Sequence, residues 1–280
     1  MKYLLGMIFV AGCSGQGQDQ DGKKADPALG ADTGINPEIA TSFAPESEAL
    51  LSEIYKQKVD ALNGGKLRDG RYVSFWRGQQ FQFYNKHYFV AFAEASRSSE
   101  NEFPALQDQV TISQATYQYV DGKWQLRTIQ DKVGKFGAYE NAPVADRSRK
   151  SKAFPNKSRK LFLSVPTFKM TAAGMRLLTE ELFLFQENKL QWQYLGQLSV
   201  GSDNTANCVS ESKAISQGRC VKSVGMLNFI DGKNDEWPVF EVLLQGAAID
   251  ATGKLLMRTK LHVIRYAYDE KSSAYVEVKQ

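Results

Sequence analysis

The sequence predicts a mainly β fold of the α+β class. Repeated antiparallel β-hairpin units are expected to form a sandwich-like or partial-propeller-like body behind one N-terminal amphipathic helix. Two observations predict the strands: apolar and polar side chains alternate with a period of two over most of the chain beyond residue 71, and three segments share the layout of aromatic strand, polar turn and second strand. Hydrophobic residues make up 42% and charged residues 24%, as in ordinary globular proteins, which excludes a wholly disordered chain.

The first fifteen residues, MKYLLGMIFVAGCSG, have the layout of an export signal. Lys2 supplies a positive charge, and the apolar run at 3–10 is half or less of the roughly 20 residues that a membrane-spanning helix needs. The run ends in an aliphatic residue, two small residues and Cys13, a motif that resembles the lipobox of bacterial lipoproteins. An ordinary cleaved signal peptide with a chance cysteine is the alternative.

The lipobox resemblance implies a location. It implies a signal peptide at 1–12, cleavage before Cys13, and acyl chains on the Cys13 sulfur and on the new N-terminus. Two or three acyl chains, at about 0.8 kcal/mol per buried CH₂, hold a protein durably on a bilayer. Because Ser14 follows the cysteine where retained lipoproteins have aspartate, the resemblance implies the outer membrane, facing the periplasm or the cell surface. No later stretch approaches 18 uninterrupted apolar residues.

The chain then divides into a tether, a helix and β units. Residues 13–45 are rich in Gly, Asp, Gln and Pro without apolar periodicity, so they predict a flexible, lipidated tether. The stretch ESEALLSEIYKQKVDALNGG predicts an amphipathic helix between Pro45 and Gly64, because apolar residues recur on one face: Leu50, Leu51, Ile54, Tyr55, Val59 and Leu62. Residues 46–146 are the helix with the first β unit, and 161–280 hold the second and third units.

Each β unit is predicted to be a hairpin behind another apolar strand. The clearest is TYQYVDGKWQLRTI, with Tyr117 and Tyr119 before an Asp121-Gly122 turn. LFLFQENKLQWQYLG and VIRYAYDEKSSAYVEV repeat the layout, and the strands behind the three are HYFVAF, KLFLSV and VFEVLL. These aromatic ladders favour the core face of a sheet over a stacking platform for sugars or bases.

Two cysteines remain when Cys13 is assigned to lipid. In an exported chain, Cys208 and Cys220 predict one disulfide bond that closes a short polar loop. A metal site is the alternative reading, but no histidine lies near them in the sequence.

The most distinctive local feature is the basic segment 147–160, RSRKSKAFPNKSRK. Like charges repel one another, so the segment is expected to be an exposed, mobile linker between β units. It is also a tentative partner-binding surface for an acidic protein or an anionic envelope lipid, and not for nucleic acid; a merely solvated linker is the alternative. Its seven cations are Arg147, Arg149, Lys150, Lys152, Lys157, Arg159 and Lys160.

The chain offers few signs of catalysis. His87 and His262 lie in separate strand patterns, and no nucleophile elbow, metalloprotease helix or phosphate-binding glycine loop accompanies them. The 31 acidic residues are too many for a carboxylate pair to be informative. Asp203 and Asn204 could offer oxygens to a cation, but a loop that uses its own side chains as caps is favoured. We therefore expect no catalytic residue, no resident metal and no cofactor.

These observations favour a binding protein. The chain resembles in general layout the small periplasmic immunity or inhibitor lipoproteins encoded beside type VI secretion effectors, which implies a role in neutralising a toxin or lytic enzyme. Two alternatives stay open: an envelope hydrolase acting on peptidoglycan, lipid or glycan through His87 or carboxylates, and a factor for envelope assembly or surface display.

Overall fold

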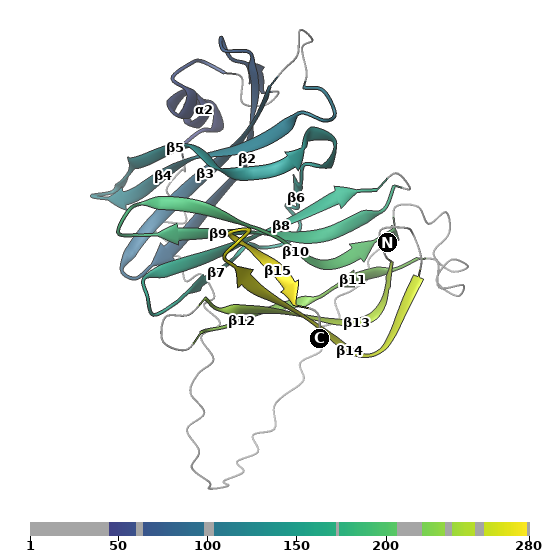
Figure 1. Ribbon diagram of the computed structural model, residues 1–280. Helices are drawn as coiled ribbons and strands as arrows, with labels where there is room; N and C mark the ends of the chain where they lie inside the picture. Colours follow the sequence, from purple (N-terminus) through teal and green to yellow (C-terminus); the bar gives the residue numbers. More distant parts are fainter. Residues whose placement is uncertain are drawn as a thin grey trace, which may run out of the picture. The chain divides into compact units, whose positions relative to one another are not determined.

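A computed structural model gives the fold of the chain (Figure 1). It describes residues 45–59, 64–97, 104–171, 174–205, 220–232, 237–249 and 255–278. Within these residues it has three antiparallel sheets and one α-helix, so the prediction of a mainly β fold is confirmed. The predicted signal peptide at 1–12, with Cys13, and nearly all of the predicted tether at 13–45 lie outside the described residues.

The first sheet is an antiparallel meander in the order β1-β2-β3-β4-β5. Its hairpin at Asp121-Gly122 is the one predicted: Val120 pairs with Lys123, and both turn residues have positive φ, 50° and 80°. Two positive φ angles are the signature of the type I′ turn that follows the twist of a hairpin. The strands are β1 (Gly65–Lys66), β2 (Arg71–Phe83), β3 (Lys86–Arg97), β4 (Gln109–Val120) and β5 (Lys123–Ala138).

The second sheet has the order β11-β10-β9-β8-β6, with β7 also paired to β8. A 3₁₀ turn, η1 (Tyr139–Asn141), leads into it. The strands are β6 (Val144–Ala145), β7 (Lys152–Pro155), β8 (Lys160–Met170), β9 (Arg176–Gln186), β10 (Gln191–Asp203) and β11 (Lys222–Val224). The third sheet has the order β12-β13-β14-β15. Its strands are β12 (Met226–Ile230), β13 (Val239–Ile249), β14 (Leu255–Asp269) and β15 (Ala274–Val278).

The three predicted hairpin units fall one in each sheet. In every case the apolar strand expected behind the hairpin pairs with its first strand: β3 with β4, β8 with β9, and β13 with β14. The unit predicted from sequence, an apolar strand followed by a hairpin, therefore occurs three times among the described residues, once in each sheet.

The second sheet is packed on both faces, and β9 shows why. Its sequence LFLF is apolar at successive positions, the pattern of a strand buried on both sides. Phe183 and Phe185 join a core with the first sheet, whereas Leu182 and Leu184 join a core with the third. All four side chains are fully buried. The sheets therefore pack face to face, as in a sandwich.

The predicted aromatic ladders form these cores. Between the first two sheets, Phe92 stacks on Phe183 with ring centroids 4.5 Å apart. Trp192 is buried there too and donates its indole N–H to Thr116 Oγ1 at 2.9 Å. In the third copy, Tyr275 packs edge-on against Phe240 at 5.0 Å. The core interpretation of the ladders is confirmed for these residues.

The N-terminal helix exists but is shorter than predicted. Helix α2 spans Ser47–Tyr55 and ends at Lys56, whose φ of 53° is left-handed and cannot continue an α-helix. Val59, expected on the helix, lies beyond it but is still buried in the cluster that α2 forms with the first sheet. The hydroxyl of Tyr117 on β4 donates to Glu53 and so helps to fix the helix on that sheet. Leu62 lies outside the described residues.

The segment 147–160, predicted to be an exposed, mobile linker between β units, contains a strand. Residues 152–155 form β7, which pairs with β8 in the register Ala153 to Leu163, and Ala153 is buried. The turn before β8 is closed by Asn156, whose Oδ1 accepts from the N–H groups of Ser158 and Lys160. Backbone pairing and a buried side chain thus outweigh the repulsion among the cations, and the segment belongs to the second sheet.

Candidate functional site

The basic segment begins in a turn built by Asp146. Ser148 donates both its backbone N–H, at 3.0 Å, and its hydroxyl, at 2.6 Å, to Asp146 Oδ1. Arg149 Nε donates to Asp146 Oδ2 at 2.8 Å. Hydrogen bonds and the Arg149 charge together hold the pKa of Asp146 below its usual range, although burial alone would raise it. An ionised carboxylate therefore holds the first turn of the segment.

Arg149, predicted to be a partner-binding cation, points into the protein. Its side chain is only 16% exposed. Besides Asp146, its guanidinium donates to Glu180 Oε1 at 3.0 Å and to the carbonyls of Thr167 and Thr179 at 2.6 and 3.0 Å. A partly buried charge needs such partners because it has lost its water. Arg149 anchors the segment to β8 and β9, and its predicted contact with a partner stays a prediction.

Two neighbouring carboxylates on β9 complete this polar cluster. Glu180 accepts from Ser164 at 2.6 Å and from Arg149, while Glu181, fully buried, accepts from Thr167 at 2.9 Å, Tyr194 at 2.6 Å and Gln197 at 2.5 Å. Burial raises the pKa of both carboxyl groups, and these hydrogen bonds oppose it.

The sequence signal for these carboxylates was two adjacent glutamates inside the apolar strand RLLTEELFLF, and the abundance of acidic residues obscured it. Both have internal partners for their oxygens, which makes them supports of the fold around Arg149.

The other cations of the segment face outward. Lys160 is half-buried, and its ammonium lies 4.7 Å from the ring centroid of Trp237. The guanidinium of Arg159 lies 5.2 Å from the ring of Tyr84, which is 49% exposed at the β2–β3 turn. The exposed members are Arg147, Lys150, Lys152, Lys157 and Arg159.

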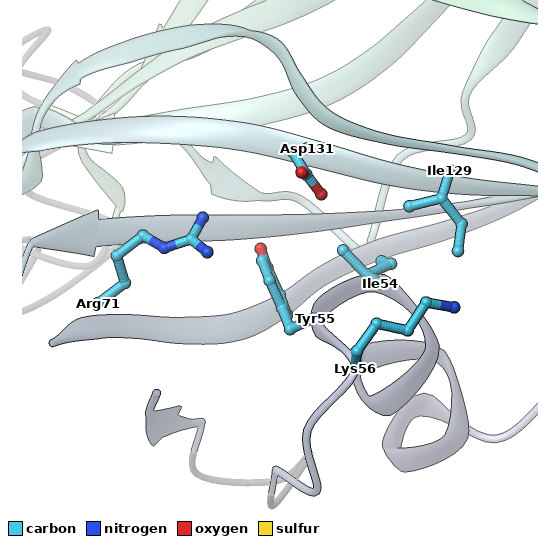
Figure 2. A pocket seen from close by; sticks show the side chains of 6 residues that line it. All are labelled: Ile54, Tyr55, Lys56, Arg71, Ile129 and Asp131. Atoms are coloured by element: carbon cyan, nitrogen blue, oxygen red, sulfur yellow. The ribbon is translucent and has the colours of Figure 1, made fainter. Parts of the chain in front are cut away.

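A separate hollow lies between α2 and the first sheet (Figure 2). Its volume is about 360 Å³, and it is lined by Ile54, Tyr55, Lys56, Arg71, Ile129 and Asp131. In Figure 2 the Arg71 guanidinium, the Tyr55 hydroxyl and the Asp131 carboxylate point toward one space, whereas Lys56 extends away from them.

Two polar side chains that line this hollow are hydrogen-bonded within the chain. Arg71 is already paired with Asp69 at 2.7 Å, and Tyr55 donates to Ser113 Oγ at 3.1 Å. Burial raises the pKa of Tyr55 to about 12, so its hydroxyl stays protonated at neutral pH and is a poor base or nucleophile.

The two histidines do not come together with carboxylates. His87, on β3, is half-buried and opposite Gln82 in the sheet register, whereas His262, on β14, is exposed and opposite Leu244. Neither lines the hollow of Figure 2, and no ion pair involving either occurs among the described residues.

Asp203 and Asn204 use their oxygens within the chain. Asp203 Oδ1 accepts from the backbone N–H and the hydroxyl of Thr205, and Asn204 Oδ1 accepts from the N–H of Val221 at 2.7 Å. This is the self-capped loop that the sequence favoured. In the described part of the chain, no three His, Cys, Asp or Glu side chains are grouped as metal ligands.

Only one cysteine of the predicted disulfide lies among the described residues. Cys220, just before β11, is disulfide-bonded, while Cys208 lies outside the described residues. Their pairing stays a prediction, which peptide mapping without reductant checks.

No protein-family model matches the chain, no curated protein matches it, and no solved structure matches it. Over the residues described, no helix has both the length and the apolar character required to cross a bilayer.

Proposed function

We propose that this protein is a lipid-anchored protein of the bacterial outer membrane that binds a macromolecular partner with an acidic surface and does not turn over a substrate. The observation that carries the proposal is the array of exposed cations from Arg147 to Arg159 on the ordered edge of the second sheet. The proposed role is that of an immunity or inhibitor protein, which blocks a toxin or lytic enzyme in the periplasm.

The charge of the array is not neutralised locally. Residues 147–160 contain no acidic residue, and their seven cations exceed the formal net charge of +4 of the whole chain. The carboxylates beside the segment already have cations: Asp146 and Glu180 are paired with Arg149, and Glu187 is paired with Lys86 at 2.7 Å. The outward cations are therefore available to an acidic partner, whose approach they would accelerate by long-range attraction.

The order of the segment favours a protein partner over a lipid surface. Anionic headgroups are attracted by the number of cations close to the membrane and require no fixed arrangement of them. Here Arg149 fixes one end of the segment and the pairing of β7 with β8 fixes its middle. Cations on an ordered backbone lose less backbone entropy on binding, which benefits a partner of defined shape.

The test replaces only the outward cations. In the triple variant Arg147→Ser, Lys150→Ser and Lys152→Ser, Arg149 is kept because its loss would damage the fold. A photo-crosslinker at Lys157 in living cells identifies the partner, and the kinetics are then measured with both purified proteins. We expect about tenfold slower association at low salt, a flatter salt dependence and nearly unchanged dissociation.

A matched control removes three positive charges from the first sheet: Lys123→Ser, Lys132→Ser and Lys135→Ser, all exposed on β5. At physiological salt, exposed charges are screened beyond about 8 Å. Loss of the three β5 lysines, which are on another sheet, should therefore change the association rate little. If both triple variants slowed association equally, the effect would come from net charge and not from the position of the cations. Unchanged association in the first variant, or release of product from an envelope polymer that requires His87, would overturn the proposal.

The anchor is tested separately. Cys13→Ser should leave the signal uncleaved or release the protein from membranes, because the acyl chains are the proposed attachment. Mass spectrometry of the mature N-terminus decides the point: an unacylated N-terminus contradicts the proposed location.

A further inference from the structure

The outer face of the third sheet is mostly apolar although it faces away from the core. The strand register places three rows of side chains on it, which run from β12 across β13 and β14 toward β15. Met226, Ile230, Val276 and Val278 on these rows are 43–55% exposed. Leu243 and Ala267, also on these rows, are half-buried and belong to none of the core clusters.

This face is the reverse of one that is already packed. The alternate residues of the same strands, such as Phe240, Val242 and Tyr266, are buried against the second sheet. A sheet that is solvated on one face has polar side chains there, as the alternation of antiparallel strands usually provides. The third sheet instead has apolar side chains on both faces, the pattern of a sheet with a neighbour on each side.

We propose that the outer face of the third sheet binds the same face of a second copy of this chain, forming a two-fold symmetric dimer. This inference is independent of the proposed partner-binding function, because it concerns a different sheet and a different chemistry.

The charges on the face favour a second copy as the occupant. Its middle row contains Glu241 and Arg265, which form an ion pair at 2.7 Å. The face is thus locally neutral and offers neither an acidic nor a basic partner a surplus charge. A two-fold axis that runs along the strands between β13 and β14 would place the 55% exposed side chain of Arg265 opposite Glu241 of the other copy.

The size of the face suits such a contact. Four strands about 4.8 Å apart, paired over the five residues of each edge strand at about 3.3 Å per residue, give roughly 300 Å² in projection. Side chains that stand above the sheet add to this area, which brings it toward the about 800 Å² per partner of a standard interface. Apolar patches of roughly 300–600 Å² on isolated proteins are often functional.

The experiment is sedimentation equilibrium of the full chain carrying Cys13→Ser, from about 1 µM to about 100 µM. We expect a dimer that Val276→Glu weakens at least about tenfold in Kd, because two carboxylates would be buried in an apolar contact. The matched control is Val144→Glu on β6, where the valine is 49% exposed, similar to the 43% of Val276, but outside the face. It should leave the Kd unchanged. If Val276→Glu does not fold, Ile230→Lys on the other edge strand replaces it.

Charge exchange tests the symmetry directly. Arg265→Glu and Glu241→Arg should each weaken self-association, since like charges then meet across the axis. A mixture of the two variant chains should associate again, because each copy supplies the charge that the other lacks. A chain that stays monomeric throughout, a Val276→Glu variant with an unchanged Kd, or a mixture that fails to associate would overturn the proposal.

Discussion

Arg149→Met is expected to destabilise the protein strongly, although the residue lies in a run of surface cations. Methionine keeps most of the length and apolar contact of arginine but removes the charge and the donors. It leaves Glu180 and Asp146, whose side chains are 11% and 13% exposed, without their cation, and two strand carbonyls without a donor. Breaking a buried pair by removing one partner costs about 3–5 kcal/mol. We expect a loss of that order at pH 7.

The control is Lys150→Met, which removes one positive charge at the exposed neighbouring position and should change the free energy of unfolding by less than about 0.5 kcal/mol. Urea unfolding followed by tryptophan fluorescence compares the two variants with the parent chain. A second variant, Arg149→Met with Glu180→Gln, should recover part of the loss because the unpaired carboxylate is gone.

The pH dependence of this loss has a definite sign. Burial raises the pKa of Glu180, and a carboxyl group whose pKa is raised by folding favours the folded state below its unfolded pKa. The pKa of Asp146 is lowered, so its contribution is lost as the pH falls through its folded pKa. Acid pH protonates the carboxylates that lose their cation in Arg149→Met, and it also weakens the ion pairs of the parent chain. The difference in free energy of unfolding between Arg149→Met and the parent therefore shrinks as the pH falls. An Arg149→Met variant within about 1 kcal/mol of Lys150→Met at pH 7 would refute the anchoring role.

Three further substitutions test the packing and the buried charges. Gly134→Ala should lower the free energy of unfolding by about 1–3 kcal/mol, as measured by thermal unfolding. The new Cβ would lie 2.4 Å from the Cβ of Tyr194 and push the first two sheets apart. Trp192→Phe should cost about 1–3 kcal/mol in the same assay by leaving the hydroxyl of Thr116 without its indole donor. Glu94→Gln should stabilise the protein more at pH 8 than at pH 5, because burial raises the pKa of Glu94 and penalises its ionised form; an equal effect at both pH values would contradict this.

Much of the fold could be predicted because its signals are local. The Asp121-Gly122 turn is specified by two residues that tolerate positive φ, and the flanking alternation specifies the strands on either side. The end of α2 was misjudged for a related reason: Val59 continues the apolar pattern of the helix and is buried, but from a segment beyond its end. Periodicity reports which residues are buried more reliably than it reports the backbone that carries them.

The sequence by itself determined the hairpins and the three repeated units, because each depends on residues a few positions apart. Only the tertiary structure decided the fate of Arg149, since its partners Glu180, Thr167 and Thr179 are 18–31 residues away along the chain and are brought close by the β8–β9 pairing. It also decided that one apolar face of the third sheet packs against the second sheet while the other is exposed. A strand's alternation defines two faces, but which face finds a neighbour depends on how the sheets stack, and long-range packing settles that stacking.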